Sequence, residues 1–362
     1  MSKPRLIAFY LPQFYPTKEN DEWWGKGFTE WTNVGRAKPL FKGHYQPKVP
    51  ADLSYYDLRI PEVREQQAKL ASEAGIEGFC YWHYWFAGNR LLDRVFKEVV
   101  ENKTPNYPFS LCWANHSWFQ KTWDPQKPDK LLMEQTYPGE NDYIDHFYNM
   151  LPAFKDERYI KVNGKLLFGI YAPLDIPDTV LFFETWNKLA IENGLNGFYF
   201  FGFTFNPQNI TKILKLGYNC AVYDNTMYVA KEQKSINNLL LKIKRKILKT
   251  PYLIKYKDYA KSTLELCGLS SNIHPCLIPN FDHSPRSAHR GIIITNSTPN
   301  YWNKLCKGIF VKLNNRNSEE NLVFIKAWNE WGEGNYLEPD LVYGKKYIEA
   351  TSNAYKTYDQ NF

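Results

Sequence analysis

Leu322-Val323-Phe324-Ile325-Lys326-Ala327-Trp328-Asn329-Glu330-Trp331-Gly332-Glu333-Gly334-Asn335-Tyr336-Leu337-Glu338-Pro339 is the stretch that says most about the fold. Its first part is apolar and β-branched, and it has the length of a buried strand. Its second part places three carboxylates, three aromatic residues and two glycines directly after that strand. The stretch therefore predicts a buried strand that ends in a loop carrying several acidic side chains.

Glu330 and Glu333 form a Glu-x-x-Glu pair just past the end of this strand. Work on a glycosidic bond needs two such groups, because one protonates the leaving oxygen and the other attacks or activates the nucleophile. The flanking Trp328 and Trp331 offer flat apolar faces on which a sugar ring can stack. Glutamates after a strand are more often simply solvated, so the surroundings have to decide between these interpretations.

Working outward from this stretch, eight strand-like segments alternate with helix-like segments along the 362 residues. The strand-like segments are mostly continuous apolar runs, which indicates a parallel sheet covered by helices. Eight such repeats predict an α/β fold, a single (β/α)8 TIM barrel domain over residues 1–362. The alternative, a doubly wound sheet, would need a Gly-rich nucleotide turn that follows none of the strands. The predicted strands are 5–10, 77–85, 109–115, 166–171, 197–203, 219–223, 274–282 and the quoted stretch, and the predicted helices are 61–74, 90–101, 142–154, 179–193, 207–216, 299–313 and 344–357.

Two segments interrupt this alternation. Residues 15–56 form a long loop between the first predicted strand and the first predicted helix. The loop is rich in aromatic residues, which is more typical of a lid or binding loop than of a connector. Residues 225–269 form a predicted basic helical insertion after the sixth strand, and the part 231–261 holds ten Lys or Arg and two acidic residues. The whole chain has a net charge of +7, so its basic character is local. The run 239–249 predicts an amphipathic helix that either lies on an anionic membrane surface or covers the barrel in solution.

The six cysteines include no Cys-x-x-Cys pair, so buried reduced thiols are expected rather than a structural zinc site. We expect no metal, no cofactor and no nucleic-acid partner. No signal peptide precedes the first strand, and no apolar run is long enough to span a bilayer. These features predict a cytoplasmic protein, with peripheral contact to the inner membrane if residues 231–261 bind lipid.

Functional groups of a (β/α)8 barrel lie at the C-terminal ends of its strands. Polar and aromatic side chains gather at these ends here, and a few convergent polar groups are what fixes a ligand in a pocket. Glu330 and Glu333 are the predicted catalytic residues. The predicted substrate-binding residues are Tyr10, Gln13, Trp24, Glu30, Trp31, His44, Tyr45, His83, Tyr84, Trp113, Asn115, His116, Tyr171, Asp282, Trp328, Asn329 and Trp331.

Five motifs, at residues 10–14, 20–34, 43–47, 81–86 and 327–335, resemble those of the WbsX family. The members of this family are described as similar to glycoside hydrolase family 99. They are often encoded with bacterial O-antigen or capsule synthesis genes. The resemblance implies a (β/α)8 barrel that acts on an oligo- or polysaccharide, including a lipid-linked one.

Family 99 contains endo-α-mannosidases that retain the anomeric configuration, and the resemblance carries their two catalytic glutamates over to Glu330 and Glu333. It implies that Glu330 deprotonates the sugar 2-hydroxyl, which attacks internally, and that Glu333 protonates the leaving oxygen. This route replaces the covalent carboxylate intermediate of most retaining enzymes. The chain departs from the family pattern at His116, where Glu is usual, and at Tyr336, where His is common. These departures leave the sugar and its linkage open.

The direction of the reaction is also open, because WbsX proteins are labelled glycosyltransferases as well. Glu330 and Glu338 have a Glu-x7-Glu spacing found in some retaining transferases, but there it lies in a Rossmann-like domain. The chain contains no Asp-x-Asp, which disfavours a metal-dependent sugar-nucleotide transferase. A transglycosylase with a lipid-linked donor is one alternative to a hydrolase, and a glycan-binding protein without activity is another.

Overall fold

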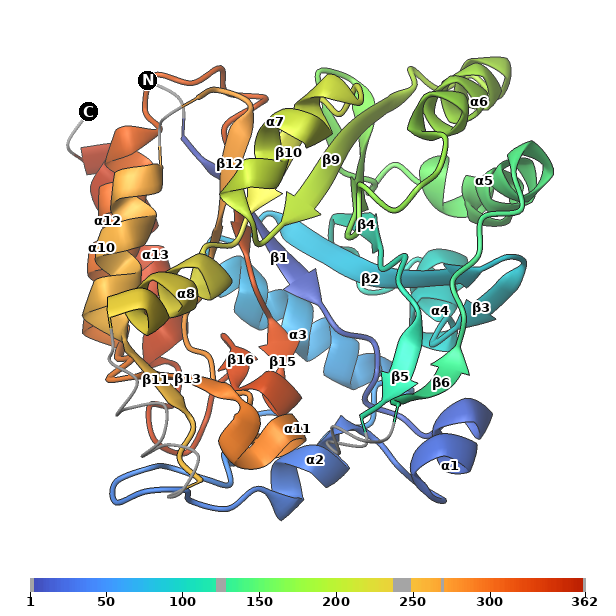
Figure 1. Ribbon diagram of the computed structural model, residues 1–362. Coiled ribbons are helices and arrows are strands. Elements are labelled where there is room, and N and C mark those ends of the chain that lie inside the picture. The colour runs from blue at the N-terminus through green and yellow to red at the C-terminus, as the bar shows by residue number, and fades with distance from the viewer. Residues whose placement is uncertain (1–2, 122–127, 237–248, 268–269, 361–362) are drawn as a thin grey trace.

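The computed structural model describes residues 3–121, 128–236, 249–267 and 270–360. Within these residues, eight parallel strands form a closed barrel with helices on its outside (Figure 1). β1 pairs with both β14 and β2, which closes the ring. The barrel strands are β1 (Arg5–Tyr10), β2 (Gly78–Phe86), β4 (Phe109–Trp113), β8 (Lys165–Ile170), β9 (Phe198–Thr204), β10 (Cys220–Tyr223), β12 (Ile273–Leu277) and β14 (Leu322–Ile325). The predicted (β/α)8 fold is confirmed.

The interior of the barrel is filled with aromatic rings below its C-terminal mouth. Phe9 stacks on Trp82 with 4.5 Å between the ring centroids, and Phe324 lies 5.6 Å from Phe9. Side chains alternate between the two faces of a strand, so Tyr84 and Lys326 share the inward direction of Trp82 and Phe324. These two polar side chains lie one step nearer the mouth. The alternation therefore decides which strand residues can reach a site there.

The helices on the outside of the barrel follow the predicted order, and the largest differences from the predicted boundaries concern one helix and one strand. The helix predicted from residue 90 begins at Arg94, because residues 89–91 form a strand that pairs antiparallel with the end of β2. The strand predicted over 274–282 ends at Leu277, ahead of Pro279, which has no N–H to donate to a ladder. These elements are β3 (Asn89–Leu91), α3 (Pro61–Glu73), α4 (Arg94–Asn102), α5 (Glu140–Phe154), α6 (Thr179–Glu192), α7 (Pro207–Lys215), α12 (Pro299–Lys312) and α13 (Lys346–Gln360).

The predicted insertion 225–269 is helical only in part. Between α8 (Thr226–Ile236) and α10 (Tyr256–Leu266), the strand β11 (Tyr252–Lys255) pairs with β13 (Ile292–Thr295). Most of the predicted amphipathic helix 239–249 lies outside the described residues, so the membrane contact of 231–261 stays a prediction. Among the helices of the described ranges, none combines the length and the apolar character that crossing a bilayer requires.

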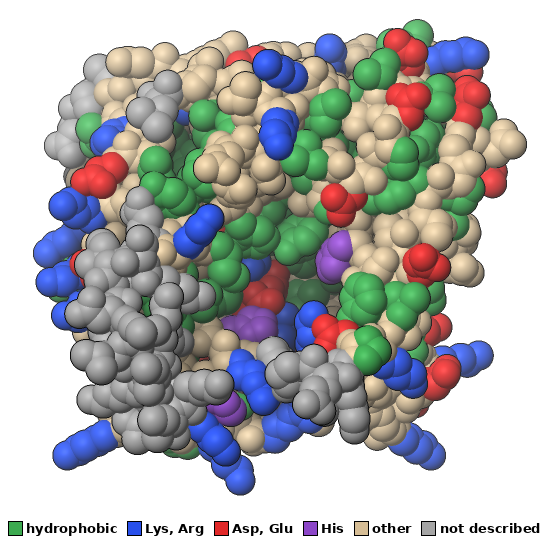
Figure 2. All heavy atoms as spheres, viewed as in Figure 1, with side chains coloured by type: hydrophobic (Ala, Val, Ile, Leu, Met, Phe, Trp, Pro, Cys, Tyr) green, Lys and Arg blue, Asp and Glu red, His purple; other side chains and the backbone are tan. Residues whose placement is uncertain are grey.

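The loops after the barrel strands carry short elements that build up one end of the molecule (Figure 1). The predicted long loop 15–56 contains two helices, and each is capped at its N-terminus by a threonine side chain. Figure 2 shows a hollow in this face, with acidic, basic and histidine side chains inside it. The short elements of the chain are α1 (Lys18–Trp24), α2 (Glu30–Arg36), β5 (Trp118–Gln120), β6 (Lys130–Met133), β7 (Lys161–Val162), α11 (Ser284–Ser287), η1 (Ala288–Arg290), β15 (Asn329–Glu330), η2 (Trp331–Glu333) and β16 (Asn335–Tyr336).

Candidate active site

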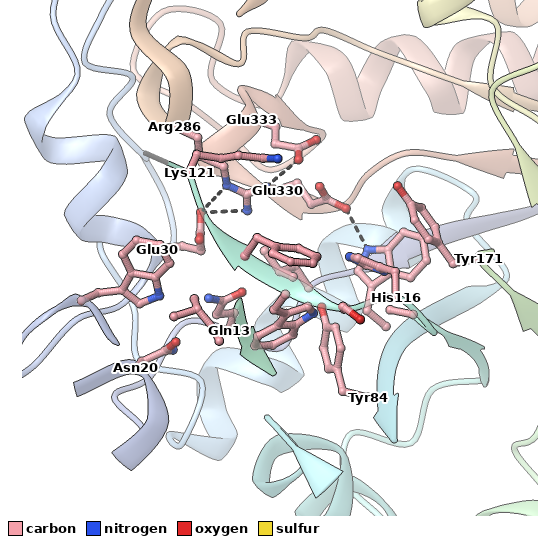
Figure 3. Close-up of a pocket in the computed structure, with 18 of the residues that line it drawn as sticks. Gln13, Asn20, Glu30, Tyr84, His116, Lys121, Tyr171, Arg286, Glu330 and Glu333 are labelled. Carbon is pink, nitrogen blue, oxygen red and sulfur yellow. Dashed lines mark hydrogen bonds and ion pairs between the residues drawn. The ribbon is translucent and has the colours of Figure 1, made fainter. Parts of the chain in front are cut away.

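A cavity of about 490 Å³ opens at the C-terminal end of the barrel and contains both predicted catalytic carboxylates (Figure 3). Its volume lies within the roughly 300–1,000 Å³ that small-molecule sites occupy. The wall combines barrel strand ends with residues from α1, α2, α11 and the β5–β6 hairpin. This is the end of a (β/α)8 barrel at which active sites are found.

Glu330 lies at the end of β15 with only 4% of its surface exposed. Its Oε1 accepts a hydrogen bond of 2.8 Å from the indole N–H of Trp82, which projects from β2 into the barrel. Burial, and after it the nearby negative charge of Glu333, raise the pKa of Glu330 to about 7. A substantial fraction of Glu330 is therefore protonated at neutral pH, as a general acid must be.

Glu333, three residues further along the same turn, is surrounded by cations. Its Oε1 lies 2.5 Å from Arg286 Nη1, and its Oε2 lies 3.2 Å from Lys326 Nζ. The ring nitrogen Nε2 of His283 lies 3.9 Å from the same carboxylate. Burial alone would raise the pKa of Glu333, but the positive charges of Lys326 and Arg286 outweigh burial and hold this pKa well below its usual range. Glu333 is therefore a carboxylate at neutral pH.

Arg286 links Glu333 to a third carboxylate, Glu30 on α2 (Figure 3). Arg286 Nη2 lies 3.0 Å from Glu30 Oε2, and Glu30 is buried. Gly332 permits this approach, because a Cβ atom at Gly332 would lie 1.9 Å from Glu30 Oε2. The series Glu30, Arg286, Glu333, Lys326 alternates in sign, so each buried charge has an opposite charge beside it, as burial requires.

The turn that carries the two glutamates is held from behind. Asn329 Oδ1 accepts a hydrogen bond of 2.7 Å from the Leu11 N–H, and Asn329 Nδ2 donates to the Leu11 carbonyl at 3.1 Å. The Trp331 ring stacks on Tyr336 at 3.7 Å, and its N–H donates to Glu338 Oε2 at 2.6 Å. Such support fixes the direction of catalytic side chains before a ligand binds.

Part of the predicted site comes together in the cavity. Both glutamates line the cavity together with six other predicted residues, which contribute amide, aromatic, acidic and histidine side chains. These predicted residues are Gln13, Trp24, Glu30, Tyr84, His116 and Tyr171.

Tyr10, His83 and Trp113 also lie on barrel strands, but they do not line the cavity. We predicted substrate contacts for them from their position near strand ends, without regard to the direction of each side chain. Alternation along the strand turns all three outward, toward the helices. There the Tyr10 hydroxyl donates to Gln67 Oε1 at 2.7 Å, His83 Nε2 lies 2.7 Å from His146 Nε2, and the Trp113 N–H donates to the Trp85 carbonyl at 3.0 Å.

Three predicted binding residues in the loops join segments of the mouth and also lie outside the cavity lining. Asn115 binds both the N–H and the carbonyl of Ala172, which connects the loops after β4 and β8. His44 Nε2 lies 2.7 Å from Asp282 Oδ2, which connects the long loop 15–56 to the segment after β12. These side chains shape the mouth by bonding to the protein.

Four of the remaining predicted binding residues lie in or beside the turn that carries Glu330 and Glu333, without lining the cavity. The Trp31 N–H donates to the Tyr56 carbonyl, and the Trp31 ring packs at 5.6 Å from that of Trp331. Trp328, Asn329 and Trp331 are buried behind the two glutamates. Tyr45 is exposed on the surface outside the cavity.

Sequence reasoning missed several residues that line the cavity. Lys326 had a recognisable signal, since it is the single charged residue in an otherwise apolar strand. Trp82 points to the same face of its strand as Tyr84, and Tyr84 was among the predicted binding residues. Arg286 gave no signal, because it reaches the site from a loop far from the glutamates in sequence. Asn20 and Trp118 also line the cavity and were not predicted.

The described residues hold no group of three or more His, Cys, Asp or Glu side chains that could bind a metal ion. All six cysteines lie in this described part of the chain as free thiols, and all except Cys267 are buried.

Comparison with known proteins gives a family and a set of relatives. The model of the family described as "Glycosyltransferase WbsX" matches residues 6–351. Two relatives, each named "Uncharacterized protein WxcX", come from two strains of Xanthomonas campestris pv. campestris. Each is 34% identical over 361 residues, which cover 96% of this chain and 49% of the relative. The chain therefore spans about half the length of the curated relatives that it matches.

Solved structures with the same architecture share little sequence with this chain. A "Glycoside hydrolase-like protein" superposes with a TM-score of 0.58 and 14% identity, over 98% of this chain and 94% of that one. The GH99 endo-α-mannosidase from Bacteroides thetaiotaomicron, in complex with BIS-TRIS-propane, gives a TM-score of 0.57 and 13% identity, over 99% of both chains. At this identity the likeness concerns the fold, which these proteins share with the present chain.

Proposed function

Because the chain belongs to the family described as glycosyltransferase WbsX, we propose that it is an enzyme acting on a glycosidic bond of a bacterial surface polysaccharide or its precursor. The proposed bond is an internal α-linkage, handled with retention of the anomeric configuration, as the resemblance to family 99 implies. The proposed substrate is a cytoplasmic, lipid-linked precursor or the glycan itself. One observation carries the proposal: two carboxylates in one cavity, with environments that push their pKa values apart.

Glu330 is the proton donor in this mechanism. Its carboxyl group gives a proton to the bridging oxygen while the bond between that oxygen and the anomeric carbon breaks. The acceptor then forms a bond to the anomeric carbon, and the Glu330 carboxylate takes the acceptor's proton, which restores the starting state. Because one carboxyl group serves both the leaving group and the acceptor, the acceptor enters from the face that the leaving group vacated. The configuration is thereby retained.

Glu333 stays ionised and stabilises the positive charge that develops at the anomeric carbon. This proposal gives the proton-donor role to Glu330, whereas the resemblance to family 99 implies Glu333. The difference rests on Lys326 and Arg286, which lie 3.2 Å and 2.5 Å from the Glu333 carboxylate. A carboxylate held between two cations is a poor proton donor near neutral pH.

Hydrolysis and transfer share these steps and differ in the acceptor, which is water in one case and a sugar hydroxyl in the other. Hydrolysis follows the resemblance to family 99, while the description of the matched family favours transfer as the second candidate. Incubation of a glycan with and without an acceptor sugar separates the two. New reducing ends indicate hydrolysis, and a longer glycan indicates transfer.

The test of the proposed function uses Glu330→Gln and Glu333→Gln in a screen against defined oligosaccharides of bacterial surface polysaccharides. The wild-type protein should cleave or extend at least one of them, and each substitution should lower the rate about 10²- to 10⁴-fold. Glu349→Gln, on the exposed side of α13, is the matched control and should leave the rate unchanged. Full activity in both cavity variants would remove the two glutamates as catalysts, and binding without turnover by the wild type would indicate a glycan-binding protein.

A further inference from the structure

One side of the cavity, beside Glu30, has its own set of polar and aromatic groups. In Figure 3, Gln13 and Asn20 lie on the side of Glu30, whereas His116 and Tyr171 lie on the opposite side of Glu330. The Gln13 side comes from α1, from the segment after β1 and from the β5–β6 hairpin. Elements separate from the catalytic turn therefore build this side.

Asn20 places a buried amide in this wall. The residue lines the cavity and is only 1% exposed, and its Nδ2 has no hydrogen-bond partner among the residues that the structure describes. A buried amide group without partners is unfavourable, so such a group needs a ligand or water to complete its bonds. Gln13 lines the same wall with a second amide. An amide offers both donors and an acceptor, which suits the hydroxyl groups of a sugar.

Aromatic rings lie beside these amides. Trp24 on α1 lines the cavity and is 40% exposed. Trp118 on β5 also lines the cavity, and its ring is fixed by Tyr84, at 5.1 Å with the planes at 80°. Trp23 meets Trp118 edge-on at 5.7 Å, which joins α1 to the hairpin. Flat apolar rings next to a few polar groups form the kind of wall that binds the C–H faces of a sugar.

The charges of this side are compensated within the described residues. Lys121 Nζ lies 2.6 Å from Asp129, and Glu30 is paired with Arg286. A charged ligand group would compete with the partners in these pairs, whereas an uncharged sugar would leave them intact. The wall is therefore suited to a neutral ligand.

We propose that Asn20, Gln13, Trp24 and Trp118 form a binding position for an uncharged sugar unit, whose neighbour in the same glycan lies at Glu330. The proposal rests on the proposed function, since it places the glycan across the catalytic turn. According to this proposal, α1 and the β5–β6 hairpin determine the length of the glycan that the site prefers.

The test measures binding to the Glu330→Gln protein, which avoids turnover. An array of defined bacterial surface glycans supplies the probes, namely the tetrasaccharide that binds best and the disaccharides it contains. Adding Trp24→Ala or Gln13→Ala should weaken tetrasaccharide binding about five- to tenfold and leave the best disaccharide within about twofold. Tyr148→Ala and Asn149→Ala, exposed on α5, are the matched controls and should change neither.

Asn20→Ala examines the buried amide in the same assay. This variant should weaken tetrasaccharide binding in the same way. The melting temperature of the variant should match that of the parent protein, because Asn20 Nδ2 has no hydrogen-bond partner among the described residues to lose. The proposed position would be overturned if these variants lost the same affinity for the tetrasaccharide and the disaccharide, or lost affinity for neither. It would also be overturned if the parent protein bound no glycan of the array. Turnover that survives Glu330→Gln and Glu333→Gln would overturn the proposed function instead, and would leave the binding result standing.

Discussion

Two glutamates three residues apart differ sharply in their surroundings. Glu330 is buried against Trp82 and has no cation within hydrogen-bonding distance among the described residues, whereas Glu333 contacts both Arg286 and Lys326. The sequence identifies the pair, because both lie directly after an unmistakable strand. It does not identify which of the two is protonated, because that depends on Arg286, which is 47 positions from Glu333 and reaches it only in the fold.

The first prediction concerns the alkaline side of the pH profile. Activity should fall as pH rises through about 7, because Glu330 loses the proton that it donates. Lys326→Met removes a positive charge that favours the ionised form, so the pKa of Glu330 should rise and the fall in activity should move to higher pH by about one unit. The measurement is kcat/KM against pH for both proteins on the glycan found in the screen. A shift of the variant to lower pH would contradict the account.

At the scale of the elements, the alternating direction of side chains along each strand determines which residues line the cavity and which pack behind it. β2 shows this most clearly, since Trp82 and Tyr84 line the cavity while His83 between them contacts His146 on α5. A prediction that considers only the position of a residue near a strand end does not distinguish such neighbours from each other. The inward direction could have been taken from Phe9 and Phe324, but only once it was known that their rings pack together inside the barrel, 5.6 Å apart.

The second prediction concerns the hydrogen bonds of Asn329, which hold the turn that carries Glu330 and Glu333. Asn329→Ala removes both hydrogen bonds to Leu11, together with a longer one of 3.4 Å to the Tyr56 hydroxyl, and leaves the buried N–H and carbonyl of Leu11 without these partners. The free energy of unfolding should fall by about 2–5 kcal/mol. Asn353→Ala, at an exposed position of α13, should change it by less than about 0.5 kcal/mol. Denaturant unfolding of the three proteins measures this, and equal stability of Asn329→Ala and the wild type would show that these hydrogen bonds contribute nothing.

At the scale of the whole molecule, the eight repeats of strand and helix were enough to predict the closed barrel. The long apolar runs are typical of strands covered on both faces, and closure follows from their number and from parallel pairing. The parts that the sequence did not predict lie in the connections. The strand β11 inside the insertion pairs with β13, and that pairing depends on tertiary contacts across about 40 residues. The cavity wall depends in the same way on α1 meeting the β5–β6 hairpin.

The third prediction follows from treating the barrel and its insertion as one domain, which we propose. Scanning calorimetry should show one unfolding transition, because β11 of the insertion pairs with β13, which follows β12 in the chain, and α10 packs against α12 on the outside of the barrel. Two separate transitions, with the smaller one abolished by substitutions in 252–266, would show that the insertion folds independently.

The most direct test of the account is the titration of Glu330 itself, which needs no substrate. Carbon-13 NMR of protein labelled at the glutamate carboxyl carbons should show a Glu330 resonance that titrates near pH 7 and that Glu330→Gln removes. It should be accompanied by the resonance of Glu338, because burial also raises the pKa of that residue to about 7. In Glu333→Gln the pKa of Glu330 should fall, because the negative charge of Glu333 helps to raise it. A Glu330 carboxyl that titrates in the ordinary range of exposed glutamates, or that does not respond to Glu333→Gln, would contradict the claim that this turn holds one proton donor beside one fixed carboxylate.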